Sequence, residues 1–139
     1  MTLNEIGRFD FRTSRSGNTA TAAILKLLAL QYRYQPARLA LGRSLGISTQ
    51  PTAVDNLDSK PIRGETLFGQ DSVDIGLWIS LITAHAGRGP LTRKELLDLV
   101  AAHWQRGAGL IWDDLRTEAD PVVALADRIL GKHVAAGIQ

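Results

Sequence analysis

The amino-acid sequence predicts a mainly α-helical protein that begins with a short strand. Three observations support this fold class. Residues 7–12 alternate between apolar or small side chains and charged ones, as in a strand with one buried face. Farther along, apolar residues recur at spacings of three and four, which is the period of an amphipathic helix. Thr92 and Glu95 have the spacing of a capping box, a marker of a helix start.

The N-terminal unit, over about residues 6–46, is predicted as a strand followed by two helices. The strand covers Ile6–Arg12. Its apolar face holds Gly7, Phe9 and Phe11, and its charged face holds Arg8, Asp10 and Arg12. The helices are expected over residues 16–31 and 36–45. The second helix is apolar around much of its circumference, which indicates burial from two sides, as in an oligomer.

The middle of the chain is predicted to leave this helical pattern and then return to it. Residues 48–61 contain two prolines and several turn-forming residues, so they read as a loop. Residues 62–68 are expected to be extended, ending at Gly69. A helix over residues 71–85 is apolar nearly all round, so we expect it at the centre of the molecule. The Gly87–Pro90 segment forms the turn that ends it.

The C-terminal part is predicted to contain two further helices. The capping box begins the first, and its buried face holds Leu96, Leu97, Val100 and Trp104. Gly107 and Gly109 are expected to interrupt it, with another turn or two over residues 110–115. Asp120 and Pro121 are the expected cap and first turn of a last helix reaching about Leu130. With no repeat and no long linker, residues 1–139 are expected to form one domain, its helical remainder spanning 62–136.

Composition excludes several classes of function. The chain has 139 residues and no cysteine, which excludes disulfides, thiolate metal ligands and a persulfide-carrying thiol. No apolar stretch reaches the eighteen residues typical of a membrane-spanning helix. The N-terminus lacks a basic segment followed by an apolar one, so no signal peptide is expected. We therefore expect a cytoplasmic protein with no membrane partner.

Positive charge is concentrated at the N-terminus. Residues 1–50 contain seven basic and only two acidic side chains, although the net charge of the whole chain is +2. We therefore expect an anionic partner at this part of the chain. The planar guanidinium group of arginine can donate two hydrogen bonds to one phosphate group. Backbone amides around Pro36–Arg38, at a helix start, are a further candidate phosphate site. The candidate DNA-binding residues are Arg8, Arg12, Arg15 and Arg38, followed by Lys26, Arg33 and Arg43.

No catalytic residue, metal ligand or cofactor is predicted. His85, His103 and His133 lie on separate predicted elements without a metal-ligand spacing, so each reads as structural or exposed. The adjacent pair Asp113 and Asp114 reads as a solvated helix face, since neighbouring helical side chains diverge. We therefore do not expect an enzyme. Nicking of DNA through His103 or the aspartate pair is the least supported alternative.

Several segments resemble the DndE-like DNA sulfur-modification proteins. The segments are Phe11–Ser14, Pro36–Leu45, Thr66–Gly69 and His103–Gly107, and the resemblance extends from about Phe9 to Leu115. It implies a compact helical fold related to ribbon-helix-helix DNA-binding proteins, assembled as a tetramer. It also implies a role in phosphorothioation, in which sulfur replaces a non-bridging oxygen of the DNA backbone.

The resemblance further implies binding of nicked double-stranded DNA through basic residues, with companion proteins supplying the sulfur chemistry. Two alternatives remain at this point. A ribbon-helix-helix transcriptional regulator would place Arg8, Asp10 and Arg12 against base edges and prefer one palindromic operator. An assembly adaptor of the modification complex would instead bury these arginines in subunit contacts.

Overall fold

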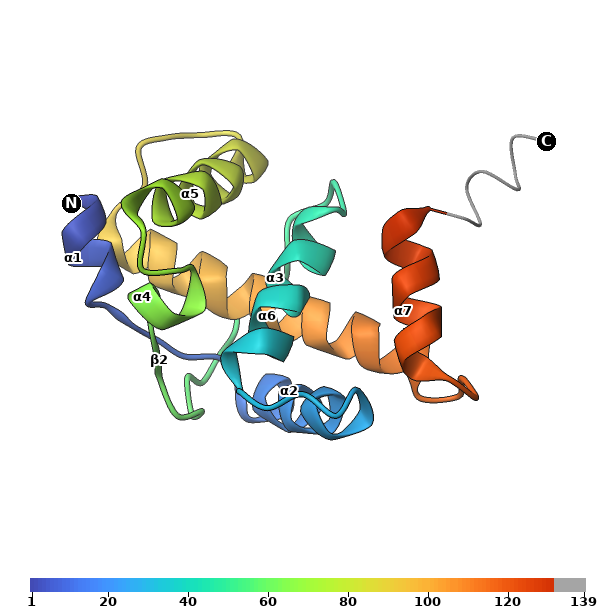
Figure 1. Ribbon diagram of the computed structural model, residues 1–139. Helices are drawn as coiled ribbons and strands as arrows, with labels where there is room; N and C mark the ends of the chain where they lie inside the picture. The colour runs from blue at the N-terminus through green and yellow to red at the C-terminus, as the bar shows by residue number, and fades with distance from the viewer. Residues whose placement is uncertain (132–139) are drawn as a thin grey trace.

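A computed structural model describes residues 1–131 of the chain (Figure 1). The elements, in chain order, are α1 (Leu3–Gly7), β1 (Asp10–Phe11), α2 (Arg15–Leu27), α3 (Tyr34–Leu45), β2 (Ile62–Arg63), α4 (Gly64–Leu67), α5 (Ser72–Ala86), α6 (Arg93–Leu115) and α7 (Pro121–Leu130). The prediction of a mainly α-helical fold is confirmed. The loop predicted over residues 48–61 contains neither helix nor strand.

Helix α6 forms the axis of the molecule, and α3 and α2 pack across it (Figure 1). Trp104 of α6 is fully buried, and its indole Nε1 donates a 2.8 Å hydrogen bond to the Thr21 hydroxyl of α2. At the crossing with α3, a Cβ on Gly107 would lie 1.7 Å from the carbonyl oxygen of Ala40. The predicted interruption at Gly107 is therefore wrong, because this glycine lets two helix backbones touch while α6 continues to Leu115.

The N-terminal strand is much shorter than predicted. Residues 3–7 form α1, because Thr2 and Glu5 make a capping box that the alternating pattern concealed. The strand itself is only Asp10–Phe11. The predicted alternation does hold at its centre, since Phe9 and Phe11 are buried while Asp10 and Arg12 are exposed.

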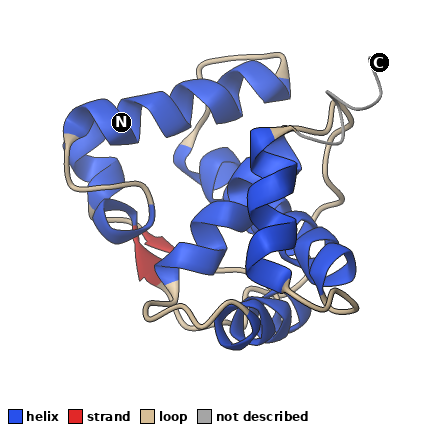
Figure 2. Cartoon of the chain, turned by 45° about the vertical axis from the view of Figure 1, so that its right-hand side comes forward, coloured by secondary structure: helices blue, strands red, loops and turns tan. Residues whose placement is uncertain are grey.

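Strand β1 pairs antiparallel with β2, with Asp10 opposite Arg63 and Phe11 opposite Ile62 (Figure 2). A backbone bond from Gly64 N–H to the Phe9 carbonyl (2.9 Å) extends this ladder. Beyond Arg63 the chain turns into α4, so the extended segment predicted over residues 62–68 is wrong after its first two residues. The predicted helix over residues 16–31 also ends early, at Leu27, and Ala29 then takes a positive φ of 52°.

Helix α5 lies at an edge of the molecule and not at its centre, contrary to the prediction (Figure 1). Only Ile75 and Ile82 are buried among its residues. Val73, Leu77 and Leu81, spaced by four, form an outer apolar stripe with exposed fractions of 73%, 58% and 46%. The all-round apolar pattern therefore leaves one face of α5 uncovered in the single chain.

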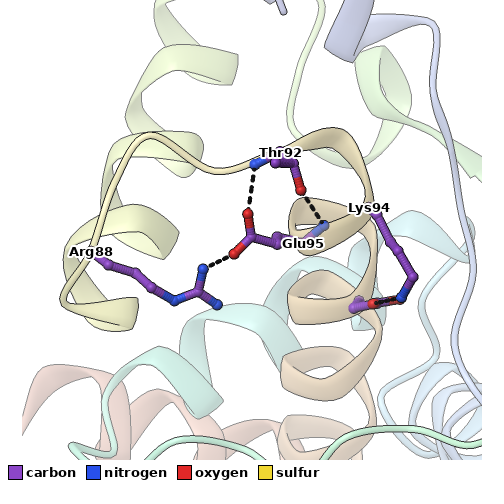
Figure 3. A network of polar contacts seen from close by, with 5 residues as sticks. Arg88, Thr92, Lys94 and Glu95 are labelled. Atoms are coloured by element: carbon purple, nitrogen blue, oxygen red, sulfur yellow. Dashed lines mark hydrogen bonds and ion pairs between the residues drawn. The ribbon is translucent and has the colours of Figure 1, made fainter.

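The start of α6 confirms the predicted capping box (Figure 3). Glu95 N–H donates to the Thr92 hydroxyl, and Thr92 N–H donates to the Glu95 carboxylate, each at 3.1 Å. Arg88 pairs with the same carboxylate across the preceding turn. The last helix also begins as predicted, with Asp120 accepting a hydrogen bond from Val123 N–H, and it ends at Leu130. Within residues 1–131, no helix combines the length and apolar character needed to span a membrane.

Candidate nucleic-acid interface

The outer side of the β1–β2 ladder carries a group of exposed cations. In the antiparallel register, Arg63 lies opposite Asp10, and the exposed residues Arg8 and Arg12 come two positions before and two positions after Asp10. Lys60 and Arg15 are exposed at the adjoining end of the ladder and at the start of α2. We call this surface the basic ladder face. It consists of Arg8, Arg12, Arg15, Lys60 and Arg63.

The cations of the basic ladder face keep most of their hydrogen-bonding capacity. Arg12 donates one bond from Nη1 to the Ser59 carbonyl oxygen (2.9 Å), which ties β1 to the loop before β2. Arg15 is 86% exposed and lies 3.9 Å from the Asp58 carboxylate. Such an exposed pair contributes little to stability and leaves the guanidinium available. Sequence analysis did not select Lys60 or Arg63, because the strand that brings them beside Arg8 lies about fifty residues later.

Lys26 is exposed in the last turn of α2. It follows Arg15 by eleven residues, a spacing of three helical turns, so both side chains lie on one outward face of the helix. Thr19 and Ala22 are exposed between them, and α2 contains no acidic residue. This face of α2 continues the basic ladder face along the helix.

Arg33 is a structural residue and not a free cation. Its Nε and Nη2 both donate to the Asn18 side-chain oxygen (3.2 and 2.7 Å), and Nη2 also donates to the Lys60 carbonyl (2.9 Å). The guanidinium lies 5.4 Å from the centre of the Trp104 ring. Burial lowers the pKa of Arg33 from its usual value. Arg33 therefore fastens α2 to the loop before β2.

Arg38 and Arg43 point away from the ladder. Arg38 donates to the carbonyl oxygens of Leu67 and Thr66 (2.8 and 3.0 Å), which holds α4 against α3. The Nε of Arg43 lies 3.3 Å from the Asp114 carboxylate of α6. The structure therefore leaves Arg8, Arg12, Arg15 and Lys26 on the ladder side, places Arg38 and Arg43 elsewhere, and gives Arg33 a structural role.

The backbone amides around Pro36–Arg38 do not form the predicted phosphate site. Helix α3 begins two residues earlier than expected, at Tyr34, and Ala37 N–H donates to the Arg33 carbonyl (3.4 Å). Pro36 and Ala37 are buried. The prediction is wrong because the amides lie inside the helix and not at its free end.

Two of the three histidines meet, the half-buried His85 and the buried His103, although they come from separate helices. The rings of His85 and His103 lie 4.7 Å apart and nearly perpendicular. Arg106 Nε donates to the Ser44 hydroxyl (2.8 Å), and the same hydroxyl shares a hydrogen bond with His103 Nδ1 (2.8 Å). Within the described residues, the Nε2 atom of His103 is buried and has no hydrogen-bond partner.

This cluster disfavours a charged imidazole. Desolvation by burial, together with the nearby His85 and Arg106, lowers the pKa of His103 from 6.5 to about 4. Ser44 and His103 are both fully buried, so the pair is a packing feature and not an accessible nucleophile and base. Arg106, which sequence analysis overlooked, also donates to the carbonyls of Ser44 and Thr49 and closes the end of α3.

The described part of the chain contains no group of three or more side chains able to hold a metal ion. Asp113 and Asp114 pair with different arginines, Arg116 and Arg43, so their carboxylates diverge as the helical pattern predicted. His133 lies outside the described residues. Comparison with protein-family models, with curated proteins and with solved structures found no significant match.

Proposed function

We propose that the chain is a non-catalytic, cytoplasmic subunit of a DNA phosphorothioation system that binds double-stranded DNA, with nicked duplex preferred. The observation that carries this proposal is the basic ladder face. Five exposed cations lie on two segments that the ladder brings together, residues 8–15 and 60–63, and the carboxylates of Asp10 and Asp58 lie among them. Because the sequence has no cysteine, the sulfur chemistry is assigned to other proteins of the system.

The arrangement suits contacts with the DNA backbone more than reading of bases. The five cations are spread over the ladder and the start of α2, and Asp10 interrupts them. Contacts from arginine and lysine to phosphates fix position but carry no sequence information. We therefore expect affinity that depends strongly on salt and weakly on DNA sequence.

A homo-oligomer, a tetramer by resemblance, is the second part of the proposal. Its support is the outer stripe of α5, where Val73, Leu77 and Leu81 are exposed together. Contiguous apolar surface of this kind marks an interaction site more often than a free surface. A second copy of the chain covering α5 would also explain why a helix apolar all round lies at an edge.

The ribbon-helix-helix regulator is less well supported. Such a regulator pairs one strand from each of two subunits, whereas β1 has two residues and pairs with β2 of its own chain. Binding that strongly favours one palindromic sequence over others would nevertheless select the regulator in place of the present proposal.

The test is fluorescence anisotropy with labelled duplexes of one sequence, intact and nicked, over a series of salt concentrations. Replacing Arg8 or Arg63 with alanine should weaken binding to all sequences alike. Each replacement should also reduce the slope of log affinity against log salt by about 1, the value for one lost phosphate contact.

Arg116→Ala is the matched control for these variants. Arg116 is 54% exposed at the end of α6 and, among the described residues, forms an ion pair only with Asp113, so its replacement should leave DNA affinity unchanged. Absence of binding to both duplexes at low salt would contradict the proposal. Equal affinities for nicked and intact DNA would contradict the proposed preference for nicked DNA but not the proposed binding of DNA.

A further inference from the structure

An apolar groove opens on the other side of the molecule, between α7 and the body. Its volume is about 900 Å³, and α3, α5, α6 and α7 all line it. The apolar lining includes Leu39, Trp78, Ile111 and Leu125. In Figure 1, α7 stands at the far end of α6, apart from α2 and α5. The groove is within the size range of a ligand or peptide site.

The two walls of the groove carry cations. Arg38 and Arg43 lie on the α3 wall and Arg128 lies on the α7 wall. Among the described residues of the lining, Asp114 is the one acidic side chain, and Arg43 already pairs with it. Arg38 retains its Nη1 and Arg43 retains both terminal nitrogens for other acceptors. The lining therefore combines an apolar floor with unneutralised positive charge on both sides.

We propose that this groove binds an acidic amphipathic helix from a partner protein. An apolar stripe on the helix would fill the floor, as helices do in hydrophobic grooves. Asp or Glu residues on each side of the stripe would face Arg38 and Arg43 on one wall and Arg128 on the other. A small carboxylate has one charged end and cannot face both walls, which favours a helix with acids on both edges.

The inference does not depend on the proposed DNA binding. Arg38 and Arg43 were candidate DNA-binding residues by sequence, but the structure places them on an apolar groove and away from the basic ladder face. Charge in the N-terminal third therefore serves two surfaces. One suits the phosphates of DNA and the other suits the acidic edges of a protein helix.

The test is selection of a displayed library of helix-forming peptides on the full chain, followed by fluorescence anisotropy with the enriched peptides. We expect apolar residues at i, i+3, i+4 and i+7, flanked by Asp or Glu. Arg128→Glu on the wall and Leu125→Glu on the floor should each weaken binding at least about tenfold, equivalent to 1.4 kcal/mol. Arg116→Glu, outside the lining, should leave binding unchanged.

Several outcomes would overturn the inference. These are no enrichment, enriched peptides without acidic flanks, or peptides that bind equally to the groove variants and the wild type. Circular dichroism of Leu125→Glu separates loss of the site from loss of the fold, and exposed Arg128 gives a second variant that leaves the apolar floor intact. If Leu125→Glu instead turns an oligomer into a monomer, the groove is an interface between copies of this chain and the proposal fails.

Discussion

At the scale of single residues, the structure assigns arginines to different tasks. Arg33, Arg38 and Arg106 each donate two or more hydrogen bonds to atoms distant in the sequence, mostly backbone carbonyls of loops and helix ends. Each fixes an irregular segment that has little apolar surface of its own to bury. Arg8, in contrast, is exposed and makes no hydrogen bond or ion pair within the described residues. Its guanidinium is therefore available to a partner molecule.

Gly107 gives a prediction for stability. Its replacement by alanine would place a Cβ 1.7 Å from the backbone oxygen of Ala40, which cannot move without separating α3 from α6. We expect the free energy of unfolding to fall by about 3 kcal/mol, the upper part of the range for overpacked cores. Urea unfolding monitored by circular dichroism measures the change.

Gly109 is the control for that substitution, because it lies in the same helix and a Cβ there would meet nothing within 4 Å. Gly109→Ala should stabilise the chain by about 0.5–1 kcal/mol through helix propensity. Similar effects of the two alanines would contradict the close crossing of α3 and α6.

His103 gives a prediction for pH dependence. Because burial lowers its pKa to about 4, the unfolded chain binds more protons at this residue between about pH 6.5 and pH 4. This contribution to stability is therefore complete above pH 6.5 and is lost as the pH falls through that window, by about 3 kcal/mol in total.

Urea unfolding at a series of pH values tests this, with His103→Asn as the comparison. The asparagine cannot titrate, so its curve should be flatter over the same window. Parallel curves for the two proteins between pH 4 and pH 6.5 would show that His103 is not the group responsible.

At the scale of elements, the capped starts of α6 and α7 were predicted correctly, whereas the end of α2 and the start of α3 were not. Caps at Thr92 and Asp120 act over three residues, and both helices begin where those caps predict. The predicted strand over residues 6–12 was too long because apolar and charged residues alternate from the end of α1 into β1. Local spacing does not show where one ends and the other begins.

The outer stripe of α5 gives a prediction at this scale. If a second copy of the chain covers the stripe, Leu77→Glu should shift the assembly toward the monomer, because it places a charge at the centre of the contact. Sedimentation velocity over a concentration series measures the change. Leu57→Glu is the control, since Leu57 is also exposed (38%) but lies in the loop before β2.

A wild-type chain that remains monomeric at all concentrations would contradict the proposed oligomer. A Leu77→Glu variant that assembles normally would contradict only the assignment of the interface to α5.

At the scale of the whole molecule, the chain brings distant segments together on two charged surfaces. The basic ladder face joins residues 8–15 to residues 60–63, and the groove joins α3 to α7. Neither surface corresponds to a continuous stretch of sequence. The count of charge in residues 1–50 therefore omitted Lys60, Arg63 and Arg128 and could not assign the basic residues to separate surfaces.

The sequence by itself determined the helical class, the loop over residues 48–61, the capped starts of the last two helices and the alternation from Phe9 to Arg12. These features depend on residues within one or two turns of each other, where spacing and caps act. The tertiary structure decided the pairing of β1 with β2, the role of Gly107, the meeting of His85 with His103 and the fate of each arginine. These features depend on contacts between residues far apart in the sequence, such as Asp10 with Arg63 and Ala40 with Gly107, which form only when the chain folds.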